Sequence, residues 1–303
     1  MSASLGQTVP DRAPWRPGPV GMIMGNAPVD GGWASLGALA REAEEHGVGA
    51  IWFTDHVFWH TPVADVTAAL ALVATATDRC AVGPLVLQLP LHLPARVAKS
   101  MSFIDHLANG RVIVGVGIGE HEAEYVAAGV GERYRRRGRL LDEGIVELRR
   151  AWAQAGDLTM APARNLPVWV GGRSERARQR AATLAEGWIP HLTPLSWFAE
   201  QQDLLTADLE TADRDPAQFT RGVGLVVAVE GTDADDAPLA WLSQTYRLPA
   251  RVFAPVLLTG SAEQVADHVQ AFRSAGADHV ALWPASSRPV DHLIPIMEAL
   301  GGR

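Results

Sequence analysis

Short runs rich in β-branched and aromatic residues alternate with longer stretches of helical periodicity along this chain. Such alternation is typical of βαβ units, in which each helix crosses over to the next strand of a parallel sheet. The expected strands are 20–24, 50–54, 81–87, 111–117, 167–170, 187–190, 222–229 and 279–283. The expected helices include 33–46, 63–77, 95–107, a long helical region over 122–153, one that ends near 184, 261–275 and 290–300.

Eight strands with intervening helices predict a (β/α)8 barrel, the TIM barrel, as a single domain over residues 19–303. A chain of 303 residues suits this fold, which often reaches such a length as one unit. A doubly wound open sheet is the alternative. Residues 1–18 are rich in Pro and Arg and lack the apolar stretch of a secretory signal, so we expect a flexible N-terminal arm there.

Composition narrows the classes of function. The net charge of −8 argues against binding to nucleic acid, which needs a positive field. No run approaches 18 consecutive apolar residues, so we expect no membrane span. Cys80 is the only cysteine, which excludes an internal disulfide and fits the reducing cytoplasm. No spacing of His, Cys and carboxylates indicates a metal site.

Asp55 and His56 come directly after the second expected strand. In a TIM barrel the chemistry belongs to the loops at the carboxyl ends of the strands. A carboxylate beside a group that titrates near neutrality is what proton transfer at pH 7 needs. The alternative is that His56 caps the following loop and Asp55 makes a salt bridge. The position at a strand end favours a functional pair.

A second candidate segment, Gly-Val-Gly-Ile-Gly over 115–119, ends the fourth expected strand and is followed by Glu120. Glycines at alternate positions let backbone or a flat ring approach closely, and tight packing in the barrel wall explains them equally well. The spacing is not that of the dinucleotide fingerprint. Gly117, Ile118 and Gly119 are candidate cofactor contacts, and Glu120 is a candidate catalytic group.

A third candidate segment is Gly171, Gly172, Arg173 and Ser174, between the fifth strand and the next helix. Backbone amides at a helix N-terminus, together with a hydroxyl and a guanidinium, suit a phosphate group. A plain N-cap would account for Ser174 alone.

Many aromatic residues lie within or beside expected strands. Trp52, Trp169 and Trp283 are expected to fill the core. Trp59 and Trp188 flank strand ends, so we expect them to line the substrate pocket.

Taken together, these segments resemble the bacterial luciferase-like superfamily, which includes FMN monooxygenases and enzymes that use the deazaflavin coenzyme F420. The resemblance runs from about Pro19 to Leu300. The matching stretches are 40–56, 83–94, 98–111, 115–125, 167–173 and 260–265. Each stretch is weakly specific, and it is their order and spacing that carry the resemblance.

The resemblance implies a cofactor ring over the carboxyl end of the barrel. It implies a backbone bulge with a non-proline cis peptide in the third strand near Leu85 and Val86, which supports that ring. Asp55 is then expected to contact the cofactor, and His56 to lie near the reactive ring carbon. Glu120 matches a glutamate of the F420-dependent sugar-phosphate dehydrogenases. The segment 171–174 falls where the cofactor phosphate is held.

Two departures from those dehydrogenases stand out. Their pocket tryptophan lies slightly further beyond the Asp-His pair than Trp59 does here, and no lysine follows Lys99. A sugar-phosphate site built from lysine is therefore excluded, and glucose 6-phosphate is not the expected substrate.

We expect hydride transfer between coenzyme F420 and a small organic substrate, with His56 and Glu120 handling the proton. The alternative is an FMN-dependent monooxygenase served by a separate reductase. A non-catalytic flavin-binding relative is the alternative from another class. By analogy with the family, we also expect a homodimer.

Overall fold

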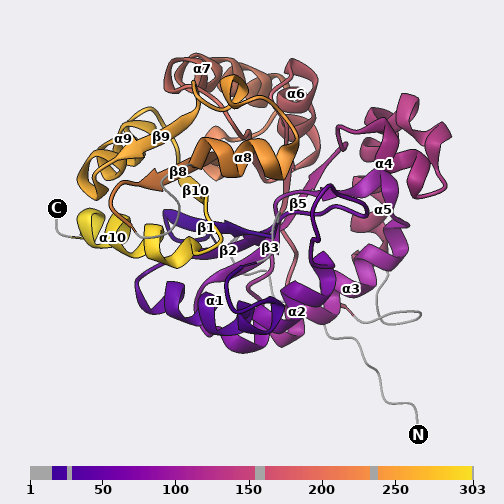
Figure 1. Ribbon diagram of the computed structural model, residues 1–303. Helices are drawn as coiled ribbons and strands as arrows, with labels where there is room; N and C mark the ends of the chain where they lie inside the picture. Colours follow the sequence, from indigo (N-terminus) through magenta and orange to yellow (C-terminus); the bar gives the residue numbers. More distant parts are fainter. Residues whose placement is uncertain (1–15, 26–28, 154–160, 233–237, 302–303) are drawn as a thin grey trace, which may run out of the picture.

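Parallel strands form a nearly closed barrel in the computed structural model, which describes residues 16–25, 29–153, 161–232 and 238–301 (Figure 1). The strands are β1 (Val20–Met24), β2 (Ala50–Phe53), β3 (Ala81–Pro84), β4 (Leu87–Gln88), β5 (Val114–Gly117), β6 (Val168–Gly171), β7 (Gly187–Ile189), β8 (Thr220–Val229), β9 (Leu257–Gly260) and β10 (His279–Pro284). Their hydrogen-bonded order is β3-β2-β1-β10-β8-β7-β6-β5-β4, with every pair parallel. The expected TIM barrel is confirmed.

The third barrel strand is divided into β3 and β4. The hydrogen-bonded strand order therefore begins with one half of this strand and ends with the other. β3 pairs with β2 and β4 pairs with β5, while a single bridge joins Val82 to Val112. The peptide bond between Leu85 and Val86 is cis, at the place that the family resemblance implies. The strand expected over 81–87 is therefore two short strands with a break between them.

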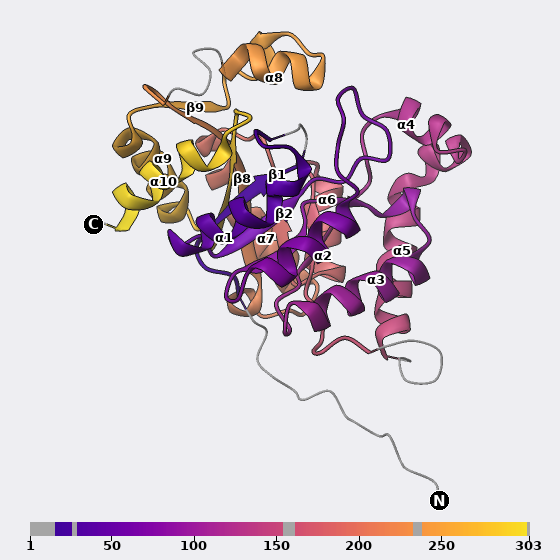
Figure 2. The same ribbon diagram turned by 60° about the horizontal axis from the view of Figure 1, so that its bottom comes forward.

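Helices surround the barrel on its outer side (Figure 1). They are α1 (Leu36–Glu45), α2 (Val66–Ala76), α3 (Pro94–Leu107), α5 (Arg137–Ala153), α6 (Glu175–Leu184), α7 (Leu195–Thr211), α9 (Ala262–Ser274) and α10 (Pro289–Gly301). Two further helices, α4 (Glu122–Ala127) and α8 (Pro238–Tyr246), both lie at the upper edge of the molecule in Figure 2, with α8 at the top and α4 at the upper right.

The long helical region expected over 122–153 is helical but not continuous. It is α4, a 3-10 segment (Gly131–Arg136) and α5. Gly129 has φ of 75°, a left-handed conformation that ends a helix and that glycine adopts without a steric penalty. The turn lets α4 stand at the barrel mouth instead of continuing along its side.

The sequence did not predict two parts of the fold. One is α7, and the other is the segment between β8 and α9, called the excursion below, which contains α8 and β9. β9 pairs only with β8 and is not part of the barrel circuit. Its residues are mostly half-exposed, so they carry no clear alternation of buried and exposed positions.

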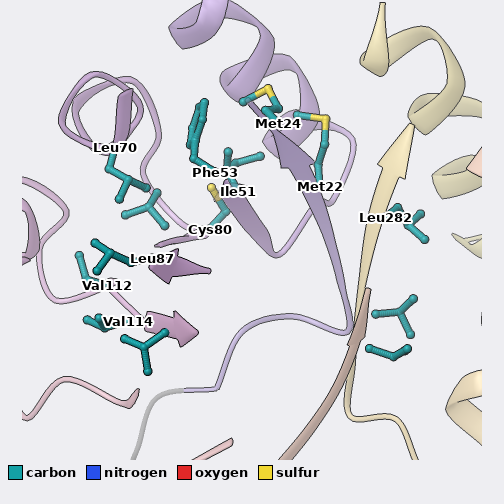
Figure 3. Close-up of a cluster of buried hydrophobic side chains, with 14 of the residues drawn as sticks. Met22, Met24, Ile51, Phe53, Leu70, Cys80, Leu87, Val112, Val114 and Leu282 are labelled. Carbon is teal, nitrogen blue, oxygen red and sulfur yellow. The ribbon is translucent and has the colours of Figure 1, made fainter. Parts of the chain in front are cut away.

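Side chains of the strands point alternately to two separate layers. The larger layer lies between strands and helices. Figure 3 shows part of it, with Leu70 from α2 on the side of Ile51 from β2, and with Met22 from β1 and Leu282 from β10 further around the barrel. Cys80 belongs to this layer, and burial raises the pKa of its thiol to about 12, as expected for an inert buried cysteine.

The smaller layer fills the inside of the barrel and includes Trp52 and Trp169, whose rings lie 5.3 Å apart. Their bulk fits only because glycines face them. A Cβ at Gly83 would lie 2.9 Å from the indole of Trp52, and one at Gly187 would lie 2.5 Å from that of Trp169. Both tryptophans are core residues, as expected.

His279 completes this inner layer and has no exposed surface. Its Nδ1 lies 2.7 Å from the carbonyl oxygen of Gly18, to which it donates, and its Nε2 accepts from the indole N–H of Trp52 at 3.0 Å. The second hydrogen bond requires the neutral ring, because a protonated Nε2 has no lone pair with which to accept. The hydrogen bond from His279 holds Gly18 against the barrel. Residues 1–15 of the expected N-terminal arm lie outside the described residues.

His279 should make folding stability depend on pH. Burial lowers its pKa to about 4, whereas the unfolded chain takes up the proton near the ordinary value of 6.5. The unfolded state therefore binds more protons between these values, and stability is lost as the pH falls from 6.5 towards 4, by on the order of 3 kcal/mol. We expect His279→Gln to flatten the dependence of the free energy of unfolding on pH over this range. Urea denaturation from pH 7 to pH 4.5 measures it, with the exposed His46→Gln as control, and equal slopes in both variants would refute the assignment.

Candidate functional site

A cavity of about 240 Å³ opens at the carboxyl ends of the barrel strands. It is lined by residues from most of the barrel and from α8, namely Ile23, Thr54, Asp55, His56, Trp59, Leu85, Val86, Gln88, Gly117, Ile118, Gly119, Glu120, His121, Gly171, Gly172, Arg173, Ile189, His191, Leu192, Gly224 and Tyr246. The end of a parallel barrel is where ligands of this fold bind.

Most candidate residues from the sequence meet in this one cavity. They are Asp55, His56, Trp59, Leu85, Val86, Gly117, Ile118, Gly119, Glu120, Gly171, Gly172 and Arg173. Their chain positions span more than a hundred residues, and the barrel brings them together because successive strand ends share one face.

Ser174 and Trp188 are not among the lining residues. Ser174 is the N-cap of α6 and accepts from the backbone N–H of Ala177. Trp188 is buried in β7, and its indole N–H donates to the carbonyl oxygen of Gly172 at 2.9 Å. Both support the glycine segment from behind, so the structure gives them positions that hold the loop.

Asp55 is buried and is not the hydrogen-bond partner of His56. Its Oδ2 accepts from the backbone N–H of Gln88 and from Nε2 of His92, both at 2.8 Å. Burial lowers the pKa of His92, but the hydrogen bond and charge of Asp55 outweigh burial and raise that pKa above its ordinary value. Asp55 therefore ties the end of β2 to β4 and to the segment that follows β4.

The partner of His56 is Glu124, from α4. Its Oε2 lies 3.3 Å from Nδ1 of His56, and its Oε1 accepts from the backbone N–H of Val57 at 2.7 Å. Only 3% of Glu124 is exposed. Burial raises its pKa, but hydrogen bonds from His56, Gln88 and the Phe58 amide outweigh burial, so the pKa lies below its ordinary value. Glu124 is thus an anion at neutral pH.

Sequence reasoning missed Gln88, His92 and Glu124. The available signal for Glu124 is its place in the first turn of a helix that begins shortly after a strand end. Nothing local marks Gln88 or His92, because both act through contacts with Asp55, 33 and 37 residues away in the chain.

Aromatic rings cover His56 on its open side. The indole of Trp59 stacks on the imidazole with ring centroids 3.9 Å apart. Around that indole lie His60 at 4.7 Å, His121 at 5.2 Å and, edge-on, Tyr246 from α8 at 5.4 Å. Trp59, His121 and Tyr246 of this group line the cavity and form its aromatic wall.

The glycines of β5 and β6 make room for Val86. A Cβ at Gly117 would lie 2.5 Å from one methyl group of Val86, and a Cβ at Gly171 would lie 2.8 Å from the other. These glycines therefore serve close packing in the barrel wall against the divided third strand, and they also line the cavity.

Three buried polar atoms of the lining have no hydrogen-bond partner within the part of the chain that the structure describes. They are Nε1 of Trp59, Oε1 of Gln88 and Nε2 of His191. Burial, with the positive charge of Arg173, lowers the pKa of His191 to about 4, so its ring is neutral. Buried polar groups are usually paired, so the cavity suits a ligand that carries both donors and acceptors.

Arg173 and Glu120 are the charged side chains at the mouth that the sequence indicates. Arg173 is exposed, and its Nη1 donates to the carbonyl oxygen of Leu192 at 2.9 Å. Leu192 has φ of 56°, an uncommon backbone for a leucine, and this bond helps to hold it. Glu120 is exposed, and its backbone oxygen accepts a hydrogen bond from the hydroxyl of Tyr134.

Over the described residues, no group of three or more His, Cys, Asp or Glu side chains could hold a metal ion. Within the same part of the chain, every helix is too short or too polar to cross a bilayer.

The chain matches the family model for luciferase-like monooxygenases over residues 19–238, well over half of its length. It belongs to that family. This luciferase-like protein is 28% identical over 236 residues to the F420-dependent hydroxymycolic acid dehydrogenase of Mycobacterium tuberculosis, an alignment that covers 71% of this chain and 63% of the relative. It is 26% identical over 283 residues to the F420-dependent glucose-6-phosphate dehydrogenase of Kineococcus radiotolerans, covering 84% of this chain and 80% of the relative. The chain thus spans less than two thirds of the first of these relatives.

Solved structures share the fold of this luciferase-like oxidoreductase. An F420-dependent secondary alcohol dehydrogenase, in complex with an F420-acetone adduct, superposes with a TM-score of 0.79 at 17% identity, over 94% of this chain and 99% of the other. The oxygenating constituent of 3,6-diketocamphane monooxygenase from Pseudomonas putida, in complex with FMN, gives a TM-score of 0.75 at 14% identity, over 94% and 98%. The fold alone thus accommodates both cofactors.

Because Val86 packs closely against Gly117 and Gly171, a methyl group added at either glycine should destabilise the protein. Gly117→Ala should push Val86 and the break after β3 out of place and lower the free energy of unfolding by about 1–3 kcal/mol. Gly301→Ala is the matched control, since a Cβ there has no atom within 4 Å. Denaturant titration of both variants measures the difference, and a Gly117→Ala protein as stable as the control would contradict the packing described.

Proposed function

We propose that this oxidoreductase transfers a hydride between coenzyme F420 and a small alcohol or carbonyl compound. The observation that carries the proposal is that His56 and Glu120, two groups able to exchange protons, line the same cavity as the glycine segments of β5 and β6. The F420-dependent relatives support the choice of cofactor.

The cavity has features that suit a flat cofactor with a phosphate-bearing tail. Gly171, Gly172 and Arg173 would hold the phosphate near the start of α6, and the backbone around Leu85 and Val86 would lie against the ring. When bound, the deazaflavin supplies the site that accepts or returns the hydride. The unpaired atoms of Gln88 and His191 can take polar edges of such a ring.

His56 has the proton-transfer role in this proposal. When the carbon of an alcohol loses a hydride, its hydroxyl must lose a proton, and His56 takes that proton as the carbonyl forms. In the opposite direction His56 returns it. Glu120 lies at the solvent side of the cavity and exchanges the proton with water.

The cavity also limits the substrate. The volume of about 240 Å³ must hold the ring as well as the reacting part of the substrate, which favours a small molecule. Lys99, the only lysine of the chain, is exposed on α3 and does not line the cavity. The site therefore offers no lysine to a sugar phosphate, which argues against glucose 6-phosphate as the substrate in this proposal.

The second candidate is an FMN-dependent monooxygenase supplied with reduced flavin by a separate reductase. Its support is the fold shared with an FMN-bound monooxygenase and the apolar lining from Leu85, Val86 and Ile118, which would shield an oxygen-activating flavin from water.

Cofactor titration distinguishes the two candidates. We expect F420 to bind with a micromolar Kd and FMN at least tenfold more weakly, followed in each case by quenching of cofactor fluorescence. Tighter binding of FMN would transfer the proposal to the monooxygenase. Binding of neither would overturn both and favour a non-catalytic relative.

Removal of the imidazole tests the role of His56. With bound F420 and a panel of short-chain secondary alcohols and their ketones, His56→Ala should lower kcat by on the order of 10²–10⁴-fold. The Kd for F420 should change by less than about threefold, because general acid–base groups act on the reaction and not on the bound tail. His46→Ala, at an exposed histidine, is the control. Full turnover by His56→Ala would rule out this role.

A further inference from the structure

Glu124 is buried directly behind His56 and does not line the cavity. His56 does line it, so the imidazole lies between a buried carboxylate and the space where substrate would bind. The proton on this ring can sit on Nδ1, towards Glu124, or on Nε2. Which nitrogen carries it is set by the hydrogen bonds that the ring makes.

The amide of Gln88 limits which hydrogen bonds Nδ1 of His56 can make. Its Nε2 lies 2.7 Å from the carbonyl oxygen of Asp55 and 3.1 Å from Oε2 of Glu124, so each of its two hydrogens has an acceptor. The reverse orientation of the amide would place its oxygen against both of those acceptors. Although Gln88 Nε2 is also 3.2 Å from Nδ1 of His56, no hydrogen is left for it to donate there.

The second constraint is the carboxylate itself. Oε1 of Glu124 accepts from the backbone N–H groups of Val57 and Phe58, at 2.7 and 3.3 Å. Oε2 faces Nδ1 of His56 at 3.3 Å, and a carboxylate oxygen can only accept. A bare lone pair on Nδ1 would face another lone pair in a buried setting. A proton on Nδ1 removes that conflict.

We propose that Glu124 is a positioning residue that keeps the proton of neutral His56 on Nδ1, so that Nε2 is the atom that accepts and returns the substrate proton. The stacked indole of Trp59, 3.9 Å from the imidazole, holds the plane of the ring in this arrangement. The proposal rests on the proposed function of His56, but the state of the ring can be measured without cofactor or substrate.

Glu124→Gln should change the tautomer of His56 while it keeps the shape of the site. The new side chain has nearly the same size, and its amide oxygen can still accept from Val57 and Phe58. Its NH₂ group would then face Nδ1 of His56 and donate to it, which moves the ring proton to Nε2. The cavity would meet an N–H donor where an acceptor is needed, and kcat for alcohol oxidation should fall on the order of 10²-fold or more. The Kd for F420 should stay within about threefold, because Glu124 does not line the cavity.

The deciding measurement is ¹⁵N NMR of the cofactor-free protein with labelled histidine, at alkaline pH where imidazoles are neutral. The shifts of the two ring nitrogens show which one carries the proton, and the signal that disappears in His56→Gln identifies the residue. We expect Nδ1–H in the unchanged protein and in Glu124→Asp, which retains a carboxylate, and Nε2–H in Glu124→Gln. Glu122→Gln, at an exposed position on the same helix, should match the unchanged protein.

An Nε2–H ring in the unchanged protein would overturn the proposal, even if Glu124→Gln failed to fold. An Nδ1–H ring retained in Glu124→Gln would overturn it as well. The expected tautomers combined with full activity of His56→Ala would leave the pairing of Glu124 with His56 intact and refute the proposed function instead.

Discussion

The inside of a parallel barrel has a fixed volume that side chains must fill, and the rest of this structure depends on how that is done. Trp52, Trp169 and His279 fill the inner layer, and they fit because glycines on neighbouring strands leave room for their rings. Towards the carboxyl ends, the wall carries glycines, Val86 and Ile118, and the volume stays open. Glycines thus allow large rings to pack inside the barrel, and near the carboxyl ends of the strands they help to leave the cavity open.

Three separate parts of the chain then hold one another at the mouth. The end of β2 brings Asp55 and His56, β4 brings Gln88, and α4 brings Glu124. The hydrogen bonds among these side chains run between different parts, so none of the three can move without leaving a further buried donor or acceptor unpaired. This mutual dependence gives His56 a fixed orientation on an otherwise exposed loop.

Much of this could be predicted from the sequence, because the signals are local. The order of strands and helices follows from periodicity, and the place of Asp55, His56 and Glu120 follows from the rule that strand ends share one face. The cis peptide after Leu85 came from the family resemblance. The partners of Asp55 and His56 could not be predicted, because Glu124 lies 68 residues from His56 and one sequence carries no record of which distant residues meet. Trp188 illustrates a different limit, since a position at a strand end does not tell to which side its side chain turns.

The excursion that contains α8 and β9 joins the barrel through β8 and still supplies Tyr246 to the aromatic wall. Such an attachment makes the contribution of Tyr246 separable from the rest of the wall, because Trp59 follows β2 and His121 precedes α4. Grafting the corresponding excursion from a relative would exchange one side of the substrate space, while the ties among β2, β4 and α4 would be inherited unchanged. Substitutions in the excursion can therefore change substrate specificity during evolution without disturbing the residues that handle the proton.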